Sequence, residues 1–124
     1  MNADPGRPDP LAAARDLLAA ERATTLERLA GLEREFDGIV EASGSANADD
    51  EHDPEGATIA FEREHVAALR DRARDHLAEI DVALRKLDDG GYGICERCGQ
   101  PIAPGRLAAR PTATMCVACA SRRA

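Results

Sequence analysis

Four cysteines near the C-terminal end are the strongest chemical signal in the sequence. They form two CxxC pairs, Cys95 with Cys98 and Cys116 with Cys119, and 17 residues separate the pairs. Two pairs at this separation match the spacing of a four-cysteine zinc site. Each pair can form a tight turn that presents two thiolates on one side, and two turns complete the tetrahedron that Zn²⁺ prefers. The spacing therefore predicts one structural zinc ion.

Two disulfides, or a redox-active CxxC, are the competing interpretations of the same thiols. We favour zinc because a redox protein does not need two matched pairs. Four protein ligands leave no open position for a reactive water, so a hydrolytic metal is not expected. The sequence has no glycine-rich phosphate loop and no nucleophile placed beside a base. We therefore predict that the chain is not an enzyme.

Two long helices are predicted to precede the cysteines, over about 11–42 and 57–88. Apolar residues recur at heptad spacing in both segments. The first row is Leu11, Leu18, Thr25, Leu32 and Ile39, with Leu29 and Phe36 in the later half of a second row that Arg15 and Arg22 begin. The row of the second helix is Ile59, Val66, Ala73, Ile80 and Leu87, with Leu69, Leu77 and Leu84 beside it.

Helices of equal length joined by a short linker can pair antiparallel and cover each other's apolar stripes. The run Asp88-Asp89-Gly90-Gly91 should end the second helix, because glycine can supply a left-handed stop. The predicted fold class is mainly α, with a long antiparallel coiled-coil helical hairpin followed by a small four-cysteine zinc-finger domain. Packing of the two helices in an oligomer is the alternative, but a self-paired hairpin favours a monomer.

Composition divides the chain into three parts. Residues 1–10 are rich in Pro and Asp and are predicted to be a disordered tail. Residues 11–89 form the hairpin, with an acidic tip at 43–57, and residues 90–124 form the zinc finger. The net charge is −7, with −11 in residues 1–90 and +4 in the remainder.

A strongly acidic body is repelled by phosphates, so we expect no direct sequence-specific or wrapping contact with DNA. It favours a protein partner with a basic surface or channel. No stretch reaches the roughly 18 apolar residues of a membrane span. The N-terminus also lacks the apolar centre of a signal peptide. We therefore expect a cytoplasmic protein that does not bind membranes.

The segment from Ile80 to Cys119 resembles the C-terminal zinc finger of the DksA/TraR family. The resemblance rests on Gly91-Tyr92-Gly93 before the first cysteine, on Cys98-Gly99, and on the run from Arg106 to Ala113 before the second pair. It implies a transcription regulator that binds RNA polymerase, inserts its coiled coil into the secondary channel and modulates initiation without touching DNA.

The resemblance also implies a function for the tip. Family members carry acidic residues and a small residue there, which act near the polymerase active site. Ala57 aligns with the family's tip alanine and Glu55 with an acidic position, while Asp53-Pro54 resembles an Asp-Pro pair with one residue fewer before the alanine. The alternative interpretation of this charge run is a solvated linker.

Four further positions of the family pattern concern ppGpp. Arg72 and Arg110 match basic residues that contact ppGpp or polymerase in family members that respond to this nucleotide. Glu79 and Ala120 stand where lysines are expected. A carboxylate repels a polyphosphate, so the sequence argues against ppGpp dependence.

Two other functions compete with polymerase regulation. A zinc ribbon could contact nucleic acid through its arginines, although stacking aromatics are missing. A coiled-coil zinc adaptor could also bind another protein and respond to oxidation by losing zinc.

Overall fold

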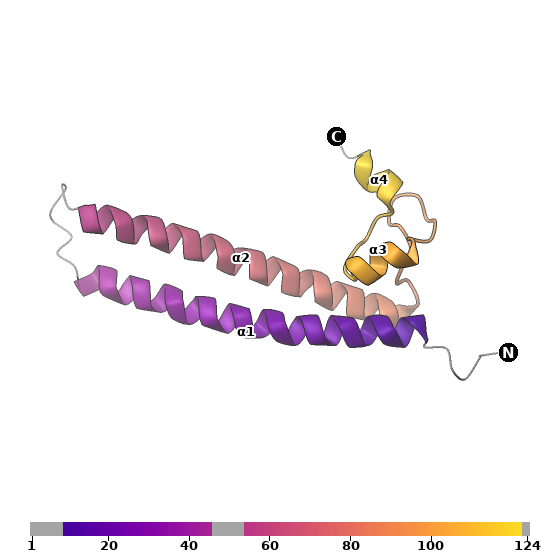
Figure 1. Cartoon of the computed structure of the whole chain (residues 1–124), viewed down its shortest axis with the longest axis horizontal. Coiled ribbons are helices and arrows are strands. Elements are labelled where there is room, and N and C mark those ends of the chain that lie inside the picture. The colour runs from indigo at the N-terminus through magenta and orange to yellow at the C-terminus, as the bar shows by residue number, and fades with distance from the viewer. Residues whose placement is uncertain (1–8, 46–53, 123–124) are drawn as a thin grey trace. The chain divides into compact units, whose positions relative to one another are not determined.

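The computed structural model describes residues 9–45 and 54–122, and this part of the chain contains four helices (Figure 1): α1 Pro10–Ser45, α2 Pro54–Asp89, α3 Pro104–Ala109 and α4 Val117–Ser121. The described residues contain no strand, only an isolated antiparallel bridge between Ile94 and Pro101. The mainly α class, with its helical hairpin and zinc-finger region, is confirmed. No helix among the described residues is long and apolar enough to cross a membrane.

The long helices extend one to three residues beyond each predicted end, and local chemistry explains the bounds. Before α1, the Asp9 carboxylate accepts a hydrogen bond from the Leu11 N–H at 3.0 Å, and Pro10 occupies the first helical position. After α2, Gly90 has φ +86°, and the Gly91 N–H donates to the Lys86 carbonyl at 2.9 Å. These two features form the predicted glycine stop.

The chain divides into two compact units, and each long helix contributes to both. The first, here called the finger unit, comprises residues 1–22 and 78–124, of which 9–22 and 78–122 are described. Its helical core is built around Leu18 and Ile80, both 0% exposed, with Ala14, Ala83 and Leu87 around them. Because its buried side chains come from both helices, the two helices hold each other in this unit.

Two ion pairs join the helices of the finger unit at the positions where the apolar seam is interrupted. Arg15 pairs with Asp88 at 3.0 Å, and Arg22 pairs with Asp81 at 2.8 Å. All four side chains are at least one third exposed, so each pair contributes only about 0.2–1 kcal/mol. The pairs therefore fix which residues face each other more than they stabilise the unit.

The second unit, here called the helical unit, comprises Ala23–Leu77, of which 23–45 and 54–77 are described. Its most buried side chains are small or β-branched: Thr25, Val66 and Ala73. The Arg70 guanidinium lies over the Phe36 ring, 4.4 Å from its centroid. Glu33 and Arg74 pair across the helices at 3.2 Å. Polar contacts thus supply much of the pairing in this unit.

The heptad rows agree with the observed burial, with one exception. The row of α2 is buried from Val66 to Leu87, and Leu18 and Thr25 are buried in α1. Leu11, however, is 52% exposed, so its predicted place in the seam is wrong. Arg15, one turn after Leu11, pairs with Asp88, and α2 ends at the next residue, Asp89. No further turn of α2 is therefore available to cover Leu11.

The adjacent leucines of α1 allow a matched test of the finger-unit core. Leu18→Ala should lower the free energy of unfolding by about 2–5 kcal/mol, because it leaves a cavity beside Ile80. Leu17→Ala removes the same atoms from a side chain that is 46% exposed and should change stability by less than about 1 kcal/mol. Urea unfolding followed by circular dichroism measures both, and equal losses would contradict the assigned core.

Candidate metal centre

The first cysteine pair lies on a tight turn closed by backbone hydrogen bonds. The Cys95 N–H donates to the Gln100 carbonyl at 2.8 Å, and the Gly99 N–H donates to the Cys95 carbonyl at 2.9 Å. Gly99 has φ +75°, which favours glycine because it has no Cβ. The turn therefore brings Cys95 and Cys98 to one side through local backbone geometry.

The second pair lies at the start of α4. Cys116 is the N-cap residue of this helix, and its sulfur accepts a hydrogen bond from the Cys119 N–H at 3.5 Å. The Ala120 N–H donates to the Cys116 carbonyl at 2.9 Å. The Glu96 N–H, which follows Cys95, donates to the Thr114 carbonyl at 2.9 Å and so connects the two cysteine-bearing segments.

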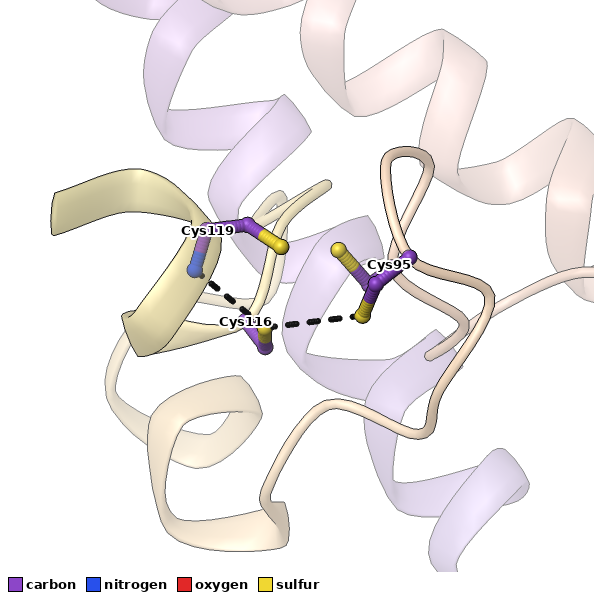
Figure 2. A group of neighbouring side chains, drawn as sticks. Cys95, Cys116 and Cys119 are labelled. Atoms are coloured by element: carbon purple, nitrogen blue, oxygen red, sulfur yellow. Dashed lines mark hydrogen bonds between the residues drawn. The ribbon is translucent and has the colours of Figure 1, made fainter. Parts of the chain in front are cut away.

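All four sulfur atoms lie within 4.8 Å of one another. Figure 2 shows the side chains of Cys95, Cys116 and Cys119 directed toward a shared centre. The Cys98 and Cys116 sulfurs are 3.9 Å apart. Tetrahedral zinc with Zn–S bonds of about 2.3 Å requires sulfurs about 3.8 Å apart, so this arrangement fits one zinc ion with four thiolate ligands.

The thiols differ in how readily they lose a proton. The pKa of Cys95 is lowered to about 6, chiefly because the backbone N–H groups of Cys98 and Cys116 stabilise its thiolate. The pKa of Cys119 is raised to about 12, first by hydrogen bonding to the Cys116 side chain and then by burial. A cation at the centre would favour the thiolate form of every ligand, so this difference between the two thiols would disappear when the metal is bound.

Few apolar side chains support the finger. Cys95, Ile102 and Cys119 are the buried residues of its hydrophobic cluster, and Leu107, Met115 and Cys116 pack against them. Arg106 donates from Nε to the Met115 carbonyl at 2.8 Å. Half of this small cluster consists of the cysteines themselves, so the finger depends on what the thiols bind.

One packing contact and one ion pair attach the finger to α2 within the finger unit. The Tyr92 hydroxyl donates to the Pro111 carbonyl at 2.8 Å, and its ring packs against the helical core around Leu18 and Ile80. The Lys86 ammonium donates to the Glu96 carboxylate at 2.6 Å. Sequence reasoning did not assign these roles; the one available signal was a tyrosine in a chain with only three aromatic residues.

Comparison with known proteins agrees with this arrangement. Residues 90–123 match the family described as the prokaryotic dksA/traR C4-type zinc finger. The RNA polymerase-binding transcription factor DksA of Caulobacter vibrioides is 58% identical over 48 residues, which are 39% of this chain and 34% of that protein. General stress protein 16O of Bacillus subtilis is 35% identical over 92 residues, or 73% of this chain and 56% of its own length.

The structure of transcription factor DksA2 from Pseudomonas aeruginosa matches 94% of this chain and 90% of its own, with a TM-score of 0.77 and 29% identity. Residues 90–123 are thus a zinc finger of the dksA/traR type. The similarity of the chain to the Caulobacter DksA spans about a third of that protein's length. The names of the DksA proteins describe transcription factors, in agreement with the prediction that this chain is not an enzyme.

The tip residues predicted from the DksA/TraR pattern are only partly described. Asp53 lies outside the described residues. Glu55 is in the first turn of α2, although its side chain lies outside the description. Ala57 is exposed in the second turn. Its exposure is compatible with a surface role for the tip.

The two arginines predicted to contact ppGpp or polymerase lie in different units. Arg72 is exposed in the helical unit, where it lines an open pocket of about 550 Å³ with Arg28 and His76. Arg110 is exposed in the finger unit and lines a pocket of about 450 Å³ that Glu79 and Ala120 also line. Glu79 and Ala120, which stand where the family pattern has lysines, thus line the same pocket as Arg110.

Removing one thiol should unfold the finger. Cys95→Ser deletes a buried donor from a cluster in which the cysteines supply half of the packing, so zinc content should fall from one equivalent to nearly none. Val117→Ala is the control, because this neighbouring side chain is 58% exposed and should keep full zinc content. Elemental analysis with limited proteolysis would check both. A fully metallated, protease-resistant Cys95→Ser protein would contradict the assignment.

Zinc affinity should rise with pH. Near pH 7 Cys95, with a pKa of about 6, is already largely thiolate, whereas Cys119, with a pKa of about 12, keeps its proton until the metal displaces it. Protons therefore compete with zinc more strongly as the pH falls. Competition with a chelator of known pH dependence at roughly pH 6 and pH 8 measures the effect. Equal affinity at both pH values would contradict the expected proton release.

Proposed function

We propose that the chain is a transcription regulator that binds RNA polymerase and inserts its acidic hairpin tip into the secondary channel to modulate initiation. The observation that carries this proposal is the match to transcription factor DksA2 over 94% of the chain. A match of that extent includes both long helices as well as the finger. Binding to polymerase would place the protein in the cytoplasm.

The charge of the tip supports the mode of binding. Five acids, Asp49, Asp50, Glu51, Asp53 and Glu55, lie within residues 43–56, and this segment has no Lys or Arg. Such a segment favours a basic channel and is repelled by nucleic-acid phosphates. Insertion into the channel would bring the tip's carboxylates close to the polymerase active site.

Zinc has a structural role in this proposal. Cys95, Cys98, Cys116 and Cys119 would hold one ion, which would supply folding energy to the finger and no reaction step. The finger would then keep a fixed attachment to α2 through Tyr92 and Lys86.

The pocket around Arg110 supports independence from ppGpp. Glu79 brings a negative charge to this pocket and Ala120 offers no charge, while Lys86 and Arg106, which also line it, are engaged by the Glu96 carboxylate and the Met115 carbonyl. A ligand with several phosphates would meet one carboxylate where the family pattern has a lysine. We therefore assign Arg110, together with Arg72, to contacts with polymerase.

The finger is less suited to nucleic acid than its arginine content suggests. Arg106 is half-buried, and its Nε is engaged by the Met115 carbonyl. Arg110 and Arg122 are exposed, but no aromatic side chain accompanies them in the described part of the finger except Tyr92, whose hydroxyl bonds to Pro111. Base stacking, which single-strand binders use, has no platform there.

Binding to purified core RNA polymerase, followed by competition with a known secondary-channel binder, tests the proposal. We expect a stable complex from which the competitor displaces the chain. A complex that resists the competitor would place the chain elsewhere on polymerase. Failure of the zinc-loaded protein to bind would leave a coiled-coil zinc adaptor with another partner.

The tip should act on transcription more than it contributes to affinity. Asp53→Asn combined with Glu55→Gln removes two charges while keeping side-chain size. The affinity for polymerase should change by less than about threefold, whereas the effect on initiation should be lost. Affinity measurement and in vitro transcription with the same preparations separate the two. Loss of binding would show that the tip is an anchor and not the effector.

A further inference from the structure

One aromatic side chain in the described structure is largely exposed to solvent. Phe61 in α2 is 77% exposed. The other two aromatic residues are engaged, because Phe36 carries the Arg70 guanidinium and Tyr92 bonds to Pro111. Single exposed apolar residues are common on proteins, so the exposure acquires meaning only from its surroundings.

Phe61 lies on the same face of α2 as the predicted tip residue Ala57. The two are four residues apart, and side chains at this spacing are neighbours on a helix surface. His65 follows after another four residues, and all three side chains are exposed. A surface through which the tip contacts a partner would therefore continue directly onto the Phe61 ring.

The charge around Phe61 indicates what kind of partner it meets. Within residues 35–45 and 55–65 there are six acids, Glu35, Asp37, Glu41, Glu55, Glu62 and Glu64, and one arginine, Arg63, but no lysine. Glu62 follows Phe61 directly, Glu64 lies three residues after it and so next to it on the helix surface, and both are exposed. An apolar ring in acidic surroundings complements an apolar recess with a basic rim.

We infer that Phe61 is an aromatic anchor that inserts into an apolar recess, rimmed by basic side chains, on RNA polymerase. This inference rests on the proposed function. A few aromatic residues commonly dominate the affinity of a protein interface, and they do so in pockets from which water is excluded. In the free protein the ring is solvated, so its contribution arises only on binding.

Phe61→Ala, compared with Val40→Ala, tests the anchor. Val40 is an apolar side chain of the other long helix that is 43% exposed, so both variants remove exposed apolar surface. We expect Phe61→Ala to weaken binding to core polymerase by at least about tenfold, and Val40→Ala by less than about threefold. Thermal unfolding should be unchanged in both. Phe61→Leu keeps apolar bulk and should recover part of the affinity.

The outcomes separate this inference from the function on which it rests. If the wild type is displaced by the secondary-channel binder and Phe61→Ala binds equally well, the anchor is refuted and the proposed function stands. If the wild type does not bind polymerase, both fail. Unchanged affinity with lost regulation would make Phe61 an effector. Self-association of the wild type that Phe61→Ala abolishes would assign the ring to a second copy of the chain, which also overturns the inference.

Discussion

The small size of the finger is the constraint on which its structure depends. Its buried hydrophobic cluster contains Cys95, Ile102 and Cys119, so only one of its three buried side chains is aliphatic. Apolar burial on this scale cannot offset the conformational entropy of ordering more than 30 residues. A metal ion shared by four thiolates changes this balance, because its binding free energy becomes folding free energy. The tight turns at Gly99 and Cys116 place the thiols in advance, which lowers the entropy that the metal must overcome.

A few contacts connect the zinc-stabilised finger to the helices of the finger unit. Tyr92 is central, because its ring packs on the helical core while its hydroxyl holds Pro111 in the finger. Lys86 and Glu96 form a second connection, 10 residues apart in sequence. The Gly90 stop ends α2 so that the chain can turn within these few residues. Zinc, turn and helix core therefore form one cooperative structure in the finger unit.

The sequence predicted the features that depend on local spacing. The two CxxC pairs indicated the metal centre, the heptad rows indicated the hairpin, and glycine indicated the end of α2. The burial of Ala14 and Ala83 was missed, because neither residue lies on the heptad rows of its helix, and their burial follows from how the helices approach each other. The contact of Tyr92 with Pro111 was equally unpredictable, since it joins residues 19 apart across an irregular segment.

Burial is distributed unevenly between the two units, and this difference bears on function. Both clusters of buried residues in the described structure, one around Leu18 and Ile80 and one around the cysteines, belong to the finger unit. The helical unit relies on the buried Val66 and Ala73, on a cation–π contact and on exposed ion pairs. Each of these polar contacts contributes about 1 kcal/mol or less. Substitutions on its surface therefore cost little stability. A protein built in this way can change the surface it offers to a partner while the finger unit keeps the fold.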